Sequence, residues 1–331
     1  MIKKRKIDHL RICIEKDVES GDAGFGGYRL LYRELPEIDF DEIDTSTSFL
    51  GKKLSYPFIV EAMTGGSSGG GEINKCMAEI AQKHGLAFGV GSQRAALEDS
   101  SLEETFKVRD VAPDIYLIAN LGAVQLNYGY GLKECRKAVK MIDADALALH
   151  VNPLQEAIQP EGDRNFKDLI GKINKIASEL DKPVILKGVG SGLTLPVAEK
   201  LGVSAFDVGG VGGTCWSIIE GCRGGEKALE VSEPFKSFGV PTSECIANLS
   251  KAGRPLIASG GVRSGVDIAK SLALGAGVAG MALPLLKAYH AGGEAVVSDY
   301  LARVFTELRI SMFLTGSLTI NELDGKIELL G

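Results

Sequence analysis

Eight short runs of apolar residues recur along the chain from residue 57 onward, and longer amphipathic segments separate them. Each run is apolar on both faces, as a strand must be in a parallel sheet that helices cover. The runs occupy residues 58–61, 87–90, 115–119, 146–149, 184–186, 205–208, 256–258 and 277–279. Helical patterns lie between them, at residues 72–83, 132–141, 166–180, 195–201, 243–251 and 266–274. The sequence therefore predicts an α/β fold of repeated β–α units.

Eight such units in succession favour a closed (β/α)8 barrel, the TIM barrel, over a doubly wound open sheet of about five or six strands. Glycines follow several helical patterns and precede the next strand, as expected at helix ends (Gly85, Gly202, Gly253 and Gly275). We expect residues 57–331 to form the barrel and residues 1–56 to form an N-terminal extension that contributes substrate contacts.

The extension predicts a helix at residues 7–15, a glycine-rich loop at 21–27 and an extended stretch. The glycine-rich loop is either a flexible arm or a ligand-contacting segment. Residues 209–240 form the longest predicted loop, which is typical of a functional lid or a disordered segment. An apolar helix is predicted at residues 296–314, and such helices commonly associate into oligomers.

The charge balance argues against nucleic acid and membranes as partners. The chain has 37 basic and 43 acidic side chains, so its net charge of -6 gives no general attraction to polyanions or lipid. No apolar run reaches the roughly 18 residues that a membrane span needs. The six cysteines are scattered without CxxC pairs, which argues against a disulfide framework or a zinc site. We therefore expect a cytoplasmic protein with reduced thiols.

The segments that follow the predicted strands are polar or rich in glycine, and in such a barrel they face the active site. The loops after the last two strands, residues 259–263 and 280–282, offer backbone N–H groups to a phosphate. Tight chain reversal is the alternative interpretation. Lys187 ends an apolar strand, where burial is costly without an anionic partner. It would stabilise negative charge on a flavin, or pair with a carboxylate for stability.

A second group of cations suggests a second anion site. Arg5 and Lys6, combined with Arg94, would bind a phosphorylated substrate, although a solvated tail is the alternative for the first two. Glu156 would hold Mg²⁺ together with phosphate oxygens, or would be surface charge. His150, at a strand end, is either a site residue or a hydrogen-bonded core group.

Taken together, these residues resemble the type 2 (FMN-dependent) isopentenyl-diphosphate delta-isomerase family. The resemblance spans nearly the whole chain and rests on Met63-Thr-Gly-Gly66, Ser92-Gln-Arg94 and His150-x-Asn-x-x-Gln-Glu156, in that order. It implies an FMN-binding TIM barrel that uses Mg²⁺ and interconverts isopentenyl and dimethylallyl diphosphate in isoprenoid biosynthesis. It also implies NAD(P)H as the flavin reductant and a homo-oligomer, a tetramer or an octamer.

The resemblance also implies a role for individual residues. Substrate contacts would be Arg5, Lys6, Ser92, Gln93, Arg94, Asn152 and Gln155. His150 and Gln155 would be catalytic, and Glu156 would coordinate Mg²⁺. FMN would be held by Ala62, Met63, Thr64, Ser92, Asn120, Lys187 and Thr214, with its phosphate near Gly261, Val262, Arg263, Met281 and Ala282. Cys215 stands where the family would have serine.

The side chains at the strand ends fit an isomerase in which a cofactor, and not a side chain, supplies the proton. No acid strong enough to protonate an alkene is visible at the strand ends, and reduced FMN would supply one through N5. Two alternatives stay open at this point. Cys215 follows the sixth strand, as in the nucleophile loop of IMP dehydrogenases. The chain could also be a flavin- or phosphate-binding module without catalysis.

Overall fold

The computed structural model describes residues 2–330, with side chains from residue 5 onward, and its centre is a closed barrel of eight parallel strands. The barrel closes because the last strand pairs in parallel with the first, Ala279 opposite Phe58. The predicted (β/α)8 barrel is therefore confirmed and the open doubly wound sheet is wrong. The strands are β4 (Phe58–Val60), β5 (Ala87–Gly89), β6 (Tyr116–Gly122), β7 (Ala146–Val151), β8 (Val184–Gly188), β9 (Ala205–Asp207), β10 (Leu256–Ala258) and β11 (Val278–Met281).

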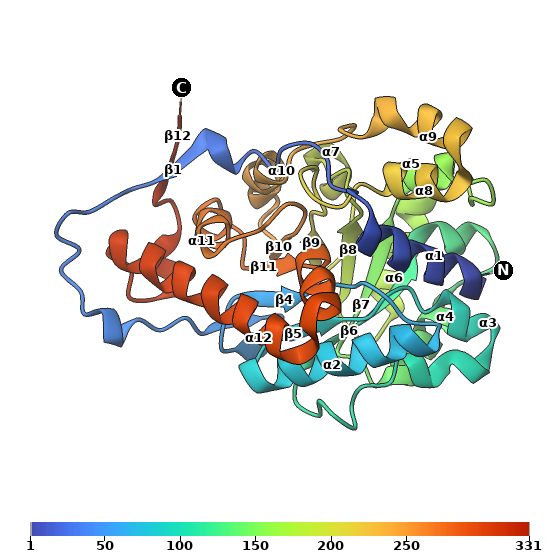
Figure 1. The fold of residues 1–331 in the computed structure, drawn as a ribbon, viewed down its shortest axis with the longest axis horizontal. Helices are drawn as coiled ribbons and strands as arrows, with labels where there is room; N and C mark the ends of the chain where they lie inside the picture. Colours follow the sequence, from blue (N-terminus) through green and yellow to red (C-terminus); the bar gives the residue numbers. More distant parts are fainter. Residues whose placement is uncertain (1, 331) are drawn as a thin grey trace.

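Helices surround the barrel and bury their apolar faces against it (Figure 1). Sequence signals set their ends: Ser264 caps the start of α11, and Gly85 ends α2 in the left-handed conformation, with φ 62°. The last long helix is kinked where Gly292 and Gly293 leave helical geometry. These helices are α2 (Ser68–His84), α4 (Leu132–Ile142), α6 (Leu169–Glu179), α7 (Leu195–Ala198), α10 (Thr242–Leu249), α11 (Gly265–Ala273) and α12 (Leu283–Leu314).

The segments between strands hold more helix than the sequence predicted. The predicted long loop at residues 209–240 contains α8 (Trp216–Gly224) and α9 (Glu226–Ser232), because Ile218, Ile219 and Cys222 recur at helical spacing. Two short helices, α3 (Arg94–Glu98) and α5 (Pro153–Ile158), begin within a few residues of the ends of β5 and β7. The 3-10 turns are η1 (Phe25–Gly27), η2 (Phe40–Glu42), η3 (Ser100–Thr105), η4 (Ala123–Asn127), η5 (Glu233–Phe235), η6 (Ser250–Ala252) and η7 (Ile320–Leu323).

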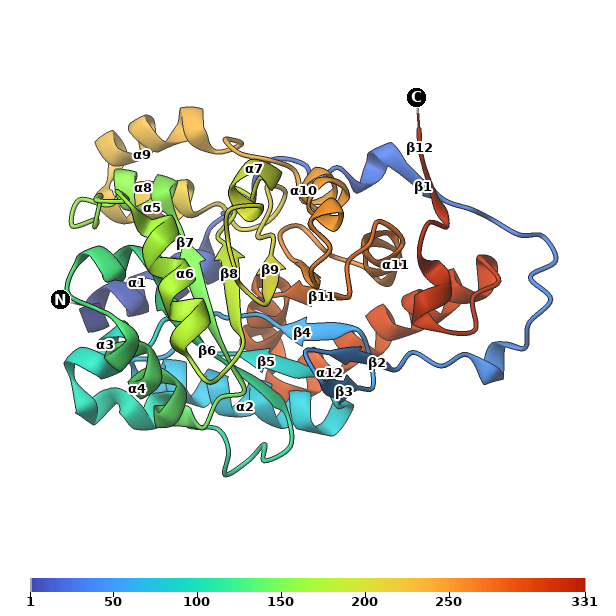
Figure 2. The same ribbon diagram turned by 180° about the vertical axis from the view of Figure 1, so that it is seen from behind.

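The N-terminal extension reaches both ends of the barrel. Helix α1 (Ile2–Glu15) packs against α8 near the carboxyl ends of the strands. The antiparallel hairpin of β2 (Thr47–Phe49) and β3 (Lys52–Leu54) lies at the opposite end, as Figure 2 shows. Between them, β1 (Tyr28–Leu30) pairs antiparallel with β12 (Ile327–Leu329). The extension therefore has a structural role, while its contacts with a substrate stay a prediction.

The glycine-rich segment 21–27 is packed against the barrel loops and is not a free arm. Ser243 N–H donates to Ala23 O at 2.9 Å, and Ser20 N–H donates to Gly213 O at 3.2 Å. Gly21 has φ 75°, and a Cβ there would lie 2.4 Å from Val211 Cγ1. The segment thus supports the glycine loops at the rim of the barrel.

The barrel has two apolar cores. The larger one fills the space between the strands and the helices. The smaller one fills the barrel interior at its amino end, where Phe49 and Leu54 of the hairpin contact inward-facing residues such as Ile59, Tyr116 and Ile185. The hairpin therefore closes this end of the barrel, and a ligand cavity must lie at the other end.

The six cysteines are free thiols, and all of them lie among the described residues. None of the helices between residues 2 and 330 is both long and apolar enough to pass through a bilayer.

We expect Phe49→Ala to lower the free energy of unfolding by about 3–5 kcal/mol, because it leaves a void in a close-packed core. Phe49 is 2% exposed, and its ring lies 5.9 Å from that of Tyr116 at 83°. Urea denaturation measures the change. Phe238→Ala is the matched control, since Phe238 is 65% exposed and its loss should change stability by only about 0.5 kcal/mol. Equal losses in the two variants would contradict the role of the hairpin.

Candidate active site

A cavity of about 250 Å³ opens at the carboxyl ends of the strands, and each barrel strand or the loop after it contributes to its wall. Helix α1 forms one side with Arg5, Lys6 and His9. Most of the residues that the sequence predicted for the site line this one cavity. They are Arg5, Lys6, Ala62, Met63, Thr64, Ser92, Arg94, Asn120, His150, Asn152, Gln155, Glu156, Lys187, Thr214, Gly261, Arg263, Met281 and Ala282.

Two predicted residues lie outside the lining. Gln93 is fully buried between the barrel and α4, where its amide donates to Ala138 O at 2.9 Å and accepts from Asn120 N–H at 3.0 Å. Its burial outside the cavity does not favour contact with a substrate. Through its hydrogen bond, Gln93 instead helps to position the backbone of Asn120. Val262 lies between two lining residues, and its own side chain is buried.

The floor of the cavity holds an ammonium between two carboxylates. Lys187 on β8 lies 2.7 Å from Glu61 Oε2, after β4, and it also hydrogen-bonds Asp207 on β9. Burial opposes the charge of Lys187, but Asp207 and Glu61 outweigh that cost and raise its pKa above the usual range. Lys187 is therefore a charged cavity-lining residue that is also paired with carboxylates.

His150 on β7 lies beside Asn120 on β6, with Nδ1 2.8 Å from Asn120 Oδ1. Burial, followed by the charges of Lys187 and Lys6, lowers the pKa of His150 to about 4. A neutral ring that donates from Nδ1 to an amide oxygen keeps a lone pair on Nε2. His150 is thus a neutral acceptor at the cavity wall, held in one orientation by Asn120.

The wall near the first strand offers hydrogen-bonding groups to a planar ligand. Thr64 is 4% exposed, and its Oγ1 has no hydrogen-bond partner among residues 5–330. An unpaired buried hydroxyl is costly, so this atom needs a bound polar group. Lys187, on the floor, adds a cation with N–H donors. These groups fit the polar edge of a flavin ring.

The glycine loops at the rim form a tight backbone cradle of a shape that would suit a phosphate. Gly260 and Gly261 have φ values of 95° and 75°, which few other residues adopt. Gly213 faces them, and a Cβ there would lie 2.5 Å from Gly261 N. The N–H groups of Arg263 and Ser264 already donate to Asp267 Oδ2, at 3.0 and 3.1 Å. The loop amides, rather than the start of α11, are therefore the better placed donors.

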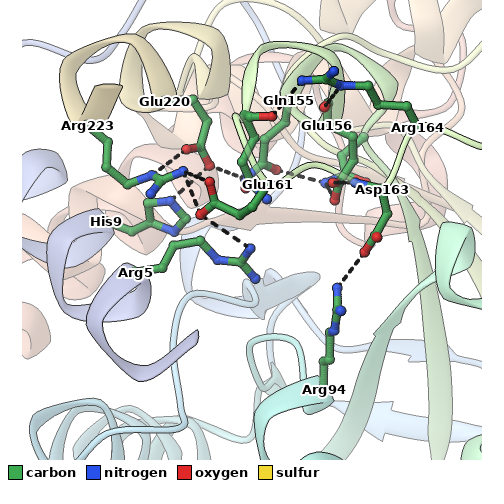
Figure 3. A network of polar contacts seen from close by, with 12 residues as sticks. Arg5, His9, Arg94, Gln155, Glu156, Glu161, Asp163, Arg164, Glu220 and Arg223 are labelled. Carbon is green, nitrogen blue, oxygen red and sulfur yellow. Dashed lines mark hydrogen bonds and ion pairs between the residues drawn. The ribbon is translucent and has the colours of Figure 1, made fainter. Parts of the chain in front are cut away.

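Cations also line the cavity: Arg94 follows β5, across the barrel from the glycine loops after β9 and β10, and Arg5 and Lys6 come from α1. Figure 3 shows Arg5 and Arg94 with their acidic neighbours. Lys6 Nζ donates to Ser92 O at 2.7 Å and lies 4.8 Å from the Phe106 ring centre. Burial, followed by the nearby charge of Arg5, lowers the pKa of Lys6 to about 7. Arg94 lies 2.6 Å from Asp163 and 2.8 Å from Glu98. Arg5 and Lys6 are thus packed into the site rather than forming a solvated tail.

Glu220 of α8 connects α1, α5 and α8 around this side of the cavity. Its carboxylate accepts from Gln155 Nε2 at 3.0 Å and from Arg223 Nε at 2.7 Å, and His9 Nε2 lies 2.9 Å away. Burial opposes ionisation, but these three neighbours prevail and lower the pKa of Glu220 to about 2. Gln159, with its amide nitrogen toward Glu220 at 2.9 Å, accepts from Arg5 at 2.8 Å.

Glu156 offers one carboxylate to a cation at the cavity wall. It is 8% exposed, so it is not a surface charge. Its oxygens accept from Asn152 Nδ2 at 3.1 Å and Asp163 N–H at 2.7 Å, and burial raises its pKa. Among the residues that the structure describes, no three acidic, histidine or cysteine side chains form a metal cluster. A cation here would need ligand oxygens in addition to Glu156, which is how Mg²⁺ binds with phosphates.

Sequence reasoning missed several polar residues of the site. Glu61 follows β4 and Asp207 ends β9, and Lys187 likewise lies near the carboxyl end of its strand, so the positions of the two acids carried a similar signal. Glu220 and Asp163 lie in segments between strands and carried no such signal. Cys215 contacts Ser217 Oγ and Lys236 O and does not line the cavity, which does not favour its role as a nucleophile.

Sequence comparisons find close relatives over nearly the whole chain. The profile of the FMN-dependent dehydrogenase family matches residues 146–328. A protein of Nostoc sp. named isopentenyl-diphosphate delta-isomerase is 48% identical and covers 96% of this chain and 93% of its own. A protein of the same name from Methanoregula boonei is also 48% identical, covering 96% and 91%.

Solved structures share the fold at low sequence identity. A flavocytochrome b2 variant with sulfite bound has a TM-score of 0.71 and 19% identity, covering 97% of this chain and 82% of its own. A mandelate oxidase variant has a TM-score of 0.65 and 18% identity, covering 100% and 99%. These likenesses support the barrel fold.

We expect Glu220→Gln to lower the free energy of unfolding at neutral pH by about 3 kcal/mol, because it leaves buried partners uncompensated. The folded pKa of Glu220, about 2, is below the ordinary 4.5, so its stabilisation is present above pH 4.5. The stabilisation is lost as the pH falls through about 2. Urea unfolding of both proteins across this range measures the difference.

Glu161→Gln is the matched control, since Glu161 contacts the same Arg223 but its side chain is 31% exposed. Its loss should cost less than about 1 kcal/mol. A difference between wild type and Glu220→Gln that stays constant down to pH 2 would contradict the assignment.

Proposed function

This chain belongs to the type 2 (FMN-dependent) isopentenyl-diphosphate delta-isomerase family, and from that premise we propose that it interconverts isopentenyl and dimethylallyl diphosphate. One observation supports the proposal most strongly. A single cavity is lined by the glycine loops after β9 and β10 and, across the barrel from them, by Arg94 after β5 together with Arg5 and Lys6 of α1. A ligand phosphate at each side would place a second molecule against the first.

FMN fits the glycine-rich side and the floor. Gly260 and Gly261 would hold its phosphate, and Thr64, Asn120 and Lys187 would hold the ring edge. Reduced FMN, when bound, supplies a group that can both donate and accept a proton. The floor lysine would then favour negative charge on the ring, since one of its N–H groups is not required by the two carboxylates.

The diphosphate of the substrate fits the cationic side. Lys6 and Arg94 would contact its oxygens, and Glu156 would share a Mg²⁺ ion with them. To contact the diphosphate, Arg94 would break at least one of its ion pairs with Asp163 and Glu98. The cations would thus fix the polar end of the substrate and leave its alkene toward the floor.

His150 and Gln155 would orient the reacting end rather than act as strong acids. Gln155 is held at both ends of its amide, since Nε2 donates to Glu220 and Oε1 accepts from Asn152 Nδ2 at 2.9 Å. His150 is neutral near pH 7 and fixed by Asn120. Neither group can readily protonate an alkene, so the residues position the substrate while the cofactor supplies the proton.

Purified protein loaded with FMN, Mg²⁺ and dithionite or NAD(P)H is expected to convert isopentenyl diphosphate into its allylic isomer, as measured by NMR. Flavin-free protein is expected to be inactive, and Cys215→Ala to keep full activity. A yellow protein that leaves the substrate unchanged after reduction would instead favour a binding module. Normal turnover with 5-deaza-FMN would show that N5 does not carry the proton.

Lys6 should make the affinity for a diphosphate fall as the pH rises above about 7. Its pKa in the free protein is about 7, so it is charged below that pH and neutral above it. A bound anion favours the charged form, so affinity falls by up to about tenfold per pH unit until the pKa of the bound state is reached. Calorimetric titration of FMN-loaded protein with inorganic pyrophosphate tests this.

The ratio of wild-type to Lys6→Gln affinity isolates the lysine, because protonation of pyrophosphate itself affects both proteins equally. Lys16→Gln is the matched control, since Lys16 is exposed directly after the end of α1, and it should follow the wild type at every pH. A ratio that does not change between pH 6 and pH 9 would refute the role of Lys6.

A further inference from the structure

The buried cluster on the floor has more acid than base. Glu61, Lys187 and Asp207 have side chains that are 7, 13 and 4% exposed, and the two carboxylates share the one ammonium. With both acids ionised, the cluster carries a net charge of −1 inside the barrel. A buried net charge is costly unless a proton or a bound group offsets it.

The two carboxylates differ in how many of their oxygens accept hydrogen bonds. Asp207 accepts from Lys187 with Oδ2 and from Ser259 Oγ with Oδ1. Glu61 accepts from Lys187 with Oε2, whereas its Oε1 has no hydrogen-bond partner among residues 5–330. Asp207 is therefore held as a carboxylate, and a proton added to the cluster belongs on Glu61.

In the part of the chain that the structure describes, the unpaired Oε1 of Glu61 packs closely against a glycine and not against a polar side chain. Gly280 on β11 faces the carboxyl, and a Cβ there would lie 2.4 Å from Glu61 Oε1. Burial, followed by the charge of Asp207, raises the pKa of Glu61 to about 7. From the neighbouring strands, Lys187 and Asp207 are the charged groups that face it. His150 on β7 is neutral, and Lys6 lies across the cavity on Ser92 O.

We propose that Glu61 is a proton-holding residue beneath the cofactor ring, which takes up a proton when negative charge accumulates on the ring beside Lys187. This inference rests on the proposed function, since it needs the FMN ring edge at Lys187. When an external reductant delivers two electrons, one proton goes to the ring and a second passes from solvent to the Glu61 carboxylate. Two electrons and two protons are then taken up, and Lys187 and Asp207 keep their charges.

The pH dependence of the midpoint potential of bound FMN tests the proposal. The potential is measured by equilibration with dyes of known potential. The measurements are made above the pH at which Glu61 ionises in the oxidised protein, so that Glu61 is free to take up a proton on reduction. Two protons per two electrons give a slope of about 59 mV per pH unit, and one proton gives about 30 mV. We expect the steep slope for the wild type and the shallow slope for Glu61→Gln, which keeps the acceptor to Lys187 but cannot titrate.

Two further variants complete the experiment. Glu61→Asp keeps a carboxyl and should retain the steep slope, and Glu199→Gln, exposed on the end of α7, should behave as the wild type. Equal slopes in wild type and Glu61→Gln, with FMN bound and the fold intact by circular dichroism, would overturn the role of Glu61 alone. A wild-type protein that binds no FMN would contradict the proposed function, and this inference with it.

Discussion

Closure of the parallel barrel decides where the polar groups at the strand ends of the site lie. Because β11 pairs with β4, each of the eight strands has a neighbour on both sides, and all their carboxyl ends meet at one rim. The hairpin of β2 and β3 fills the other end with Phe49 and Leu54. Side chains that are far apart in sequence, such as Glu61 and Asp207, are therefore brought to one cavity floor.

Charge compensation is the second constraint, since several ionisable side chains of the site are buried. Lys187 has two carboxylate partners, Arg94 has Asp163 and Glu98, and Glu220 has several donors. Lys6 is the exception: it is stabilised by a carbonyl oxygen and an aromatic ring, and its pKa is lowered. A site that holds one incompletely compensated cation beside other cations is suited to an incoming anion.

Much of the fold could be predicted from the sequence because the barrel depends on a local pattern. The eight apolar runs coincide with β4 to β11, and the helical patterns end near the observed helix ends. The insert of residues 209–240 was predicted less well, since α8 and α9 are short and their stability depends on packing. The sequence predicts only an extended stretch where the hairpin of β2 and β3 lies. The surface that the hairpin packs against, the barrel interior, is formed by residues distant in sequence.

The sequence by itself determined which residues follow the strands, and hence most of the cavity wall, because position along a β–α unit fixes which end of the barrel a residue occupies. Only the tertiary structure decided what those side chains contact. It turned Gln93 away from the cavity, gave Lys187 two acidic partners, and brought Glu220 from α8 to Gln155. Such pairings depend on distances between separate elements, and no spacing along the chain encodes them.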